Sequence, residues 1–446
     1  MNIALTRTKA ETALTEQFER IADALPGDAR VLDARKSAIG TFASLGLPHR
    51  RIEEWKYTDL RQAVKEAGTA SVTAGDASEA MLSAALGPLS GVDAYRLVFV
   101  DAQFNADMSR VPEAGVRFET LATALSSGEF DVASAGLRAG PSATGVVTLN
   151  TALMTDGAVL DIAPGTVLDK PLLIVQLKSD TSSTWTSLRS QIRVGKDAQV
   201  TILEAAVAGP DAAIGQRNHL TDIRVGDRAE VTHVIAGMQD GDTVLVNIVS
   251  TIGEASNYRP FFFTAGPTLV RNQLAVEFAG EDAKFDCSGA FLGRGSAHID
   301  NTLIIDHAVP GGESRELFKG VLDDRARGVF QGKVIVRQIA QKTDGKQMAQ
   351  ALMLSEDSEF DSKPELEIYA DDVACGHGST CTEVEPDHVF YLRARGIPEA
   401  AARALLVEAF IAEAIEKIQH TDLADALGDV ARQWLRQKAA STAETL

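Results

Sequence analysis

The chain has 446 residues, 45% of them hydrophobic, and a formal net charge of −19. This length is too great for one ordinary compact core, so the chain should divide into two or three parts or form an elongated repeat. The acidic charge argues against a nucleic-acid binder or a protein of anionic membrane surfaces. The sequence has no apolar stretch of membrane-spanning length and no apolar signal-peptide core, and its three cysteines are widely spaced. Together these features indicate a soluble cytoplasmic protein.

Residues 1–145 are predicted to form a largely helical N-terminal region. Apolar residues recur at steps of three and four between Thr8 and Leu25, as on one face of an α-helix. Residues 67–91 are rich in Ala, Gly, Ser and Thr and are predicted to be a loose connection. The run Arg96 to Val100 is predicted to be a strand.

Residues 146–373 are predicted to form a β-helix core. Short β-branched runs are separated by Gly or Asp, and one strand–turn–strand unit recurs with its glycines 30 and 31 residues apart. The aligned glycines are Gly165, Gly195 and Gly226. A fixed period of this kind is typical of a stacked solenoid, whereas an antiparallel sandwich, the alternative, need not repeat its turns at one interval.

The same alignment places three isoleucines at equivalent positions, each three residues before an aligned glycine. These are Ile162, Ile192 and Ile223. If the repeat is read correctly, the three side chains should point inward in successive coils.

Residues 374–446 are predicted to hold a sequence motif and then a helical region. Pro398 and Glu399 mark a helix start, and the apolar residues Phe410, Ile411 and Ile415 lie on one face of that helix. Such a stripe usually faces a core, but docking of a partner is the open alternative. A second helix is predicted from 423 to 438.

The motif combines Cys375 and His377 at the end of an alternating strand. In extended geometry these two side chains project from the same face, and a thiolate beside an imidazole suits iron, zinc or sulfur chemistry. Cys381 and His388 could complete a zinc site, although the spacing does not match paired zinc knuckles. The third alternative is an ordinary strand end with a hydrogen-bonded histidine.

Two further groups have a chemical and a structural interpretation. Asp323, Arg325 and Arg327 could catalyse sugar cleavage on a β-helix, but a polar turn is the simpler interpretation. An alternating group could ligate a metal, but a solvated strand face is the simpler interpretation. Its members are His298, Asp300, Asp306 and His307.

Cys287 is predicted to lie in the core. The pair Gly345-Lys346 is followed by Gln347, so the chain has no phosphate-binding P-loop.

The run from Lys363 to Gly396 resembles the SufB/SufD family of iron–sulfur cluster assembly scaffolds. It contains Pro-Glu-Leu-Glu-Ile-Tyr-Ala-Asp-Asp-Val-x-Cys-x-His-Gly and then Phe-Tyr-Leu-Arg-x-Arg-Gly-Ile. The segment Glu53 to Thr58 and the low cysteine count are similar to the SufD branch of that family. The run departs from the commoner family pattern at Gly376 and Ser379.

The resemblance implies a right-handed parallel β-helix between helical ends, in complex with SufB and the ATPase SufC. SufC is expected to dock on the helical region from about Gly396 to Lys438, where Phe410, Ile411 and Ile415 lie. His377 matches the family histidine that faces a SufB cysteine, and Cys375 is the motif cysteine beside it.

The implied function is a non-enzymatic scaffold that supports iron entry and nascent cluster assembly. His377 and Cys375 would contact iron or a cluster transiently, with no permanent cofactor. The resemblance also allows a reduced flavin in the complex and a homodimer of the isolated chain. The alternatives are a solenoid carbohydrate lyase and a purely structural homo-oligomer.

Overall fold

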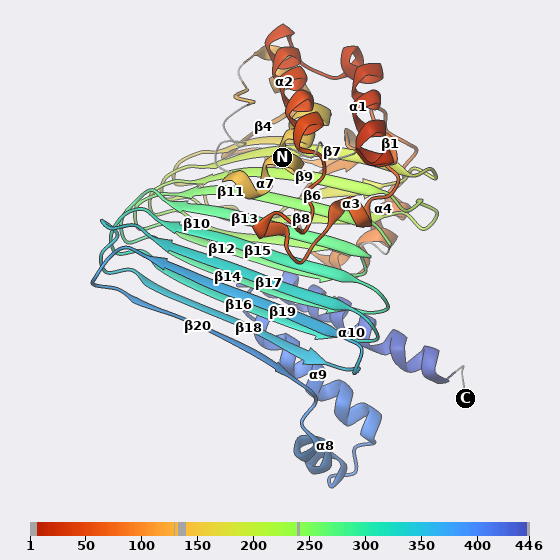
Figure 1. The fold of residues 1–446 in the computed structure, drawn as a ribbon, viewed down its shortest axis with the longest axis vertical. Helices are drawn as coiled ribbons and strands as arrows, with labels where there is room; N and C mark the ends of the chain where they lie inside the picture. Colours follow the sequence, from red (N-terminus) through yellow and green to blue (C-terminus); the bar gives the residue numbers. More distant parts are fainter. Residues whose placement is uncertain (1–6, 129, 133–139, 239–240, 444–446) are drawn as a thin grey trace, which may run out of the picture.

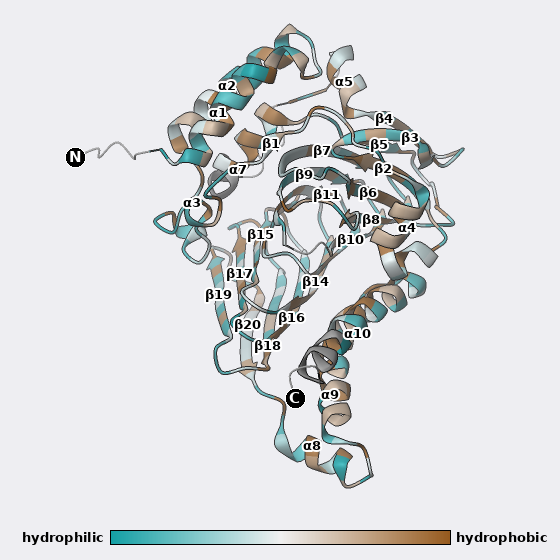
Figure 2. Ribbon diagram, turned by 90° about the vertical axis from the view of Figure 1, so that its right-hand side faces the viewer, coloured by the Kyte–Doolittle hydropathy of each residue, from teal (hydrophilic) through white to brown (hydrophobic). Residues whose placement is uncertain are grey.

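The computed structural model describes residues 7–128, 130–132, 140–238 and 241–443. Parallel strands are stacked through the middle of the chain, with the N-terminal helices at one end (Figure 1). The C-terminal helices lie beside the later coils and extend beyond the last one (Figures 1 and 2). The predicted fold, a β-solenoid between two helical regions, is therefore confirmed.

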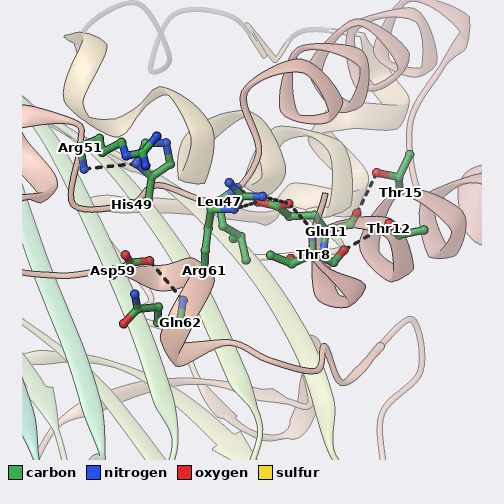
Figure 3. A network of polar contacts seen from close by, with 10 residues as sticks. All are labelled: Thr8, Glu11, Thr12, Thr15, Leu47, His49, Arg51, Asp59, Arg61 and Gln62. Atoms are coloured by element: carbon green, nitrogen blue, oxygen red, sulfur yellow. Dashed lines mark hydrogen bonds and ion pairs between the residues drawn. The ribbon is translucent and has the colours of Figure 1, made fainter. Parts of the chain in front are cut away.

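The N-terminal region begins with two helices, α1 (Lys9–Ile21) and α2 (Ala29–Leu45). The Thr8 side chain accepts a hydrogen bond from the Glu11 backbone, and the Glu11 carboxylate accepts one from the Thr8 backbone, which makes a capping box. The same carboxylate accepts from the Leu47 amide at 2.8 Å and pairs with Arg61 (Figure 3). One glutamate thus holds the start of α1, the end of α2 and the segment around α3 (Leu60–Ala63) together.

The capping box leads to a stability prediction. Thr8→Ala removes the hydroxyl that caps α1, so we expect a loss of about 1 kcal/mol in the free energy of unfolding. Chemical denaturation would measure it. Thr12→Ala is the matched control, since Thr12 is exposed and lies within the helix. Equal losses in the two variants would show that the cap does not stabilise the fold.

The prediction of a loose connection at residues 67–91 is wrong for the second half of that segment. It contains α4 (Glu79–Leu86), followed by the 3-10 helix η3 (Gly87–Gly91). Ser78 caps α4 by accepting from the Met81 amide, and Leu82 and Leu86 are buried. The alanine and serine residues of this segment therefore belong to a short helix, whose apolar face packs against a sheet.

The rest of the first 153 residues mixes strands with helices. The predicted strand is confirmed as β2 (Tyr95–Val100), and β2 pairs in parallel with a solenoid strand. The other elements are η1 (Ala22–Ala24), η2 (Glu53–Trp55), β1 (Thr69–Ala70), β3 (Gln103–Arg110), β4 (Val116–Thr120), α5 (Leu121–Ser127) and α7 (Gly140–Leu153).

The solenoid has two strands per coil, one in each of two facing sheets. The odd-numbered strands are β5 (Ala158–Ile162), β7 (Thr184–Val194), β9 (Gln216–Val225), β11 (Thr243–Ile252), β13 (Leu269–Phe278), β15 (His298–His307), β17 (Arg327–Val336) and β19 (Glu359–Ile368). The even-numbered strands are β6 (Leu172–Lys178), β8 (Gln199–Ala208), β10 (Glu230–Gly237), β12 (Asn257–Ala265), β14 (Lys284–Gly293), β16 (Glu313–Leu322), β18 (Asp344–Met353) and β20 (Ala374–Thr382). Successive strands within each of these two series pair in parallel, which excludes the antiparallel sandwich.

The predicted repeat is correct in period but shifted by two residues in its first coil. Ile192 pairs with Ile223 as expected, whereas the partner of Ile192 in β5 is Leu160 and Ile162 pairs with Val194. The turn position with positive φ is Gly165 in the first coil and Asp197, not Gly195, in the second. Since side chains alternate with a period of two, a shift of two leaves Ile162 on the inward face, where it is buried.

The solenoid is apolar both inside and along one outer face. Inward side chains of both sheets form the central core. A second core lies on the outer face of the even-numbered strands, under α4, α9 (Glu399–Ile415) and α10 (Thr421–Ala443). The predicted helices after Pro398 are confirmed, and a further helix, α8 (Pro386–Arg393), precedes them. The expected boundary at residue 373 falls inside the solenoid, because β20 runs on to Thr382.

Candidate assembly site at the open end of the solenoid

The motif residues lie on the last strand of the solenoid. Register pairs Cys375 with Gly345 and His377 with Gln347 in β18. Gly345 and Gln347 are buried and face the interior, so Cys375 and His377 also share the inward face. Within the part of the chain that the structure describes, no later coil covers β20, so the two residues lie at the open end of the interior.

The two side chains differ in accessibility. Cys375 is half-buried and packs against the central core, and this burial raises the pKa of its thiol. A raised pKa makes the thiolate scarcer at neutral pH. His377 is exposed. In the isolated chain the imidazole is therefore the more available metal ligand or proton acceptor.

The other two cysteines occupy different environments. Cys381 is exposed on β20, and partial burial raises the pKa of its thiol. Cys287 is fully buried in the central core, as predicted. Within the ranges that the structure describes, no three His, Cys, Asp or Glu side chains are placed to hold a metal ion. A preformed zinc site from Cys375, His377, Cys381 and His388 is therefore not supported among these residues.

The open end also presents two unpaired strand edges. β19 and β20 are the terminal strands of their sheets, and each is nine or ten residues long. All residues of β19 and β20 are exposed or half-buried, whereas each earlier solenoid strand has buried residues. Unpaired edges of this length readily pair with strands of another chain.

The predicted solvated face of β15 is wrong for Asp300 and His307, which are buried, whereas His298 and Asp306 are half-buried. Asp300 is fully buried, pairs with Arg271 and accepts a hydrogen bond from Thr58. His298 contacts the Thr58 hydroxyl at 2.8 Å. His307 is also buried, and the half-buried Asp306 pairs with Arg337.

The burial arises because the Glu53 to Thr58 segment lies across the odd-numbered strands. Trp55 stacks on the Arg271 guanidinium at 3.9 Å, and Arg271 donates to the Glu54 carbonyl at 2.8 Å. Lys363 on β19 pairs with Glu53 at 2.7 Å. This charged and aromatic segment therefore ties the N-terminal region to the middle and last coils.

The residues of the hypothetical lyase do not form a catalytic group. Asp323 is buried in the turn between β16 and β17, and Arg327 pairs with Asp361 and Glu359 of the next coil. These contacts support the interpretation as a polar turn that holds neighbouring coils together.

The predicted docking residues divide between core and surface. Ile411 and Ile415 are buried in the second core, whereas Phe410 is half-buried with Lys319 4.4 Å above its ring. Two exposed aromatic residues that pattern reasoning did not select lie on α8. Phe390 is 73% exposed and Tyr391 is 55% exposed. Their adjacency in the Phe-Tyr-Leu-Arg run was the available signal.

Comparison with known proteins places this solenoid among iron–sulfur cluster assembly proteins. Residues 177–410 match the SUF system FeS cluster assembly SufBD core domain, and residues 8–174 match the SufBD protein N-terminal region. The chain therefore belongs to the SufBD family of the SUF system.

Curated relatives agree with this assignment. An iron–sulfur cluster assembly SufBD family protein of Synechocystis is 31% identical over 93% of this chain and 94% of its own length. The iron–sulfur cluster assembly protein SufD of Escherichia coli is 27% identical over 85% of this chain and 87% of its own length. SufD of Bacillus subtilis is 26% identical over 61% and 63%, respectively. Across the described residues, no helix is both long and apolar enough to cross a membrane.

Proposed function

We propose that this chain is a SufD-type scaffold subunit that works with SufB-type and SufC-type partners in cluster assembly. The observation that carries the proposal is the open end of the solenoid, where an accessible histidine lies on one of two terminal strands. A second solenoid could extend both sheets across this end and bring its own thiols to His377. Family membership supports the same arrangement.

In this proposal the chain performs no catalysis of its own. Its role is to place His377, with Cys375 beside it, where iron enters and a nascent cluster forms. A neutral imidazole can bind iron or accept the proton of a partner thiol. Iron and the cluster are cargo of the scaffold and not permanent cofactors. A reduced flavin would be bound by the complex. The proposed location of the complex is the cytoplasm.

We further propose that the SufC-type ATPase docks on the exposed side of the C-terminal helices. The buried Ile411 and Ile415 would support this surface from beneath, and Phe390, Tyr391 and part of Phe410 would form contacts. Exposed aromatic side chains are common anchors of interfaces. This modifies the sequence-based choice of docking residues within the same helical region.

The docking surface leads to a prediction about capture of the ATPase. The double variant Phe390→Ser, Tyr391→Ser should weaken SufC binding at least about tenfold, because it removes two aromatic anchors. Binding of purified SufC to the immobilised chain would measure this. Leu45→Ser is the matched control, since Leu45 is 50% exposed at the end of α2. Undiminished capture by the double variant would place the docking surface elsewhere.

The subunit arrangement is tested by mixing the purified chain with purified SufB and SufC proteins. We expect one complex of defined stoichiometry on size-exclusion chromatography with light scattering. Disrupting the edge of β20 by Thr380→Pro should weaken the SufB contact and spare the SufC contact, because proline cannot donate a ladder hydrogen bond. A chain that only self-associates in this mixture would favour the structural homo-oligomer.

A further inference from the structure

A column of polar side chains continues from His377 into the interior of the solenoid. Register places one such residue on each of four consecutive even-numbered strands, directly beneath one another. They are Cys287 on β14, Glu316 on β16, Gln347 on β18 and His377 on β20, and we call them the interior column. Neighbouring strands are about 4.8 Å apart, so each member lies within one strand spacing of the next.

Two members of the interior column are buried, and neither has a charged partner. Glu316 and Gln347 are each 3% exposed. Neither amide atom of Gln347 has a hydrogen-bond partner among the described residues, and the Glu316 carboxylate has only the nearby Ser314 hydroxyl and no basic partner. Buried polar groups normally have partners, and an unpaired carboxylate is especially costly. Burial raises the pKa of Glu316 to about 8. The Ser314 hydroxyl and the charge of Arg315 act in the opposite direction, but their effect is smaller.

The nearby basic side chains are engaged elsewhere. Arg315 points outward on β16 and pairs with Asp344 at 2.7 Å, and Lys346 lies 3.4 Å from the same carboxylate. Glu316 is therefore left without an ion-pair partner. A pocket of about 680 Å³ near these strands lies on their outer face, where Arg315, Lys346 and Met348 line it, so it does not open the interior. The interior column reaches the open end only through its last member, His377, which is exposed.

The donor types in the interior column suit a borderline transition metal. Thiol, carboxylate, amide oxygen and imidazole groups all bind ferrous iron, and the spacing allows only neighbouring members to share an ion. A cation held by Glu316 and Gln347 would satisfy both side chains, and water would fill its other positions. Because three strong ligands do not converge, such a site would hold the metal weakly and release it readily.

We propose that Glu316 and Gln347 form an interior binding site for ferrous iron, two strands beneath the assembly interface. The proposal rests on the proposed function, since it gives the scaffold's iron cargo a holding position. Iron would enter past His377, remain at the inner pair, and return to the interface when partner thiolates compete for it. Each ion moves without a change of oxidation state, so no redox partner is needed.

Equilibrium dialysis of the isolated full chain against Fe²⁺ without oxygen tests the proposal. Glu316→Gln should weaken binding at least tenfold, and Gln347→Leu should weaken it several-fold. Glu313→Gln is the matched control, since it removes the same charge from the outward face of the same strand. Gln347→Glu adds a carboxylate and should tighten binding. Thermal unfolding of each variant reports its folding.

The outcomes separate this inference from the proposed function. If Glu316→Gln, Gln347→Leu and Gln347→Glu all bind Fe²⁺ as the wild type does, the interior site is refuted. The same result follows if Glu313→Gln loses as much binding as Glu316→Gln. If Glu316→Gln does not fold, the two Gln347 variants decide. His377→Ala should keep inner-site affinity within about twofold, so loss of cluster assembly in that variant tests the interface alone.

Discussion

His377→Ala is expected to remove most cluster formation by the assembled complex while leaving the chain folded. The side chain is exposed at the end of β20, so its loss should change the free energy of unfolding by less than about 1 kcal/mol. Its imidazole is the accessible ligand of the open end, because burial disfavours the Cys375 thiolate. Losing it would remove an iron ligand or misplace a partner thiolate.

The measurement is the initial rate of cluster formation in the reconstituted complex at equal amounts of folded chain. Ser379→Ala is the matched control, since Ser379 lies two residues further along the same face of β20 and is also exposed. We expect Cys375→Ala to have a smaller effect than His377→Ala. Wild-type rates in both His377→Ala and Cys375→Ala would mean that the motif is structural.

Asp300→Ala is expected to cause the largest loss of stability, about 3–5 kcal/mol. It leaves the Arg271 guanidinium, whose side chain is 1% exposed, without its carboxylate. It also removes the acceptor of the Thr58 hydroxyl, so the Glu53 to Thr58 segment loses its anchor on β15. Arg271 cannot escape the penalty by losing its proton, because guanidinium groups remain charged.

Chemical denaturation would measure this loss, with Asp306→Ala as control. Asp306 lies on the same strand and pairs with Arg337 at the surface, so its removal should cost no more than about 1 kcal/mol. The double variant Arg271→Met, Asp300→Leu should recover part of the stability, since it leaves no unpaired charge. Equal losses for Asp300→Ala and Asp306→Ala would show that the buried pair does not anchor the segment.

The solenoid could be predicted because its turns repeat along the sequence. Glycine was a poor marker of equivalent turn positions, because the residue with positive φ is a glycine only in the first of these coils. The left-handed position is filled by Gly165 in the first coil and by Asp197 and Arg228 in the next two. Glycine reaches that conformation easily, yet a well-packed coil can hold other residues there. The repeat period could therefore be predicted from the sequence. The correct alignment of the first coil could not, because it depends on which residues pair between neighbouring strands.

Burial of polar residues could not be predicted from local patterns. Asp300 and His307 lie in a strand that mixes polar and apolar residues, which favours a half-exposed strand. Asp300 is covered by Thr58, which is 242 residues away in the sequence, and His307 is enclosed by the coil itself. The same holds for the interior column, whose members are about 30 residues apart and meet only through strand register.

The site motif itself was readable, and so was the helical region after it. Cys375 and His377 share a face because two residues apart in a strand always do. The sequence could not distinguish docking residues from core residues. Ile411 and Ile415 have the helical spacing that an apolar stripe would show in either role. Deleting residues 396–446 would uncover the second core, so point substitutions are the better probes of docking.

The central claim is that this chain completes the site at which iron and sulfide become a cluster. The most direct measurement is the iron and acid-labile sulfide bound by purified SufB and SufC proteins after reconstitution with and without this chain. We predict substantial cluster formation only when the chain is present, and its loss when His377→Ala replaces the wild type. Equal iron and sulfide contents with and without the chain would contradict the claim.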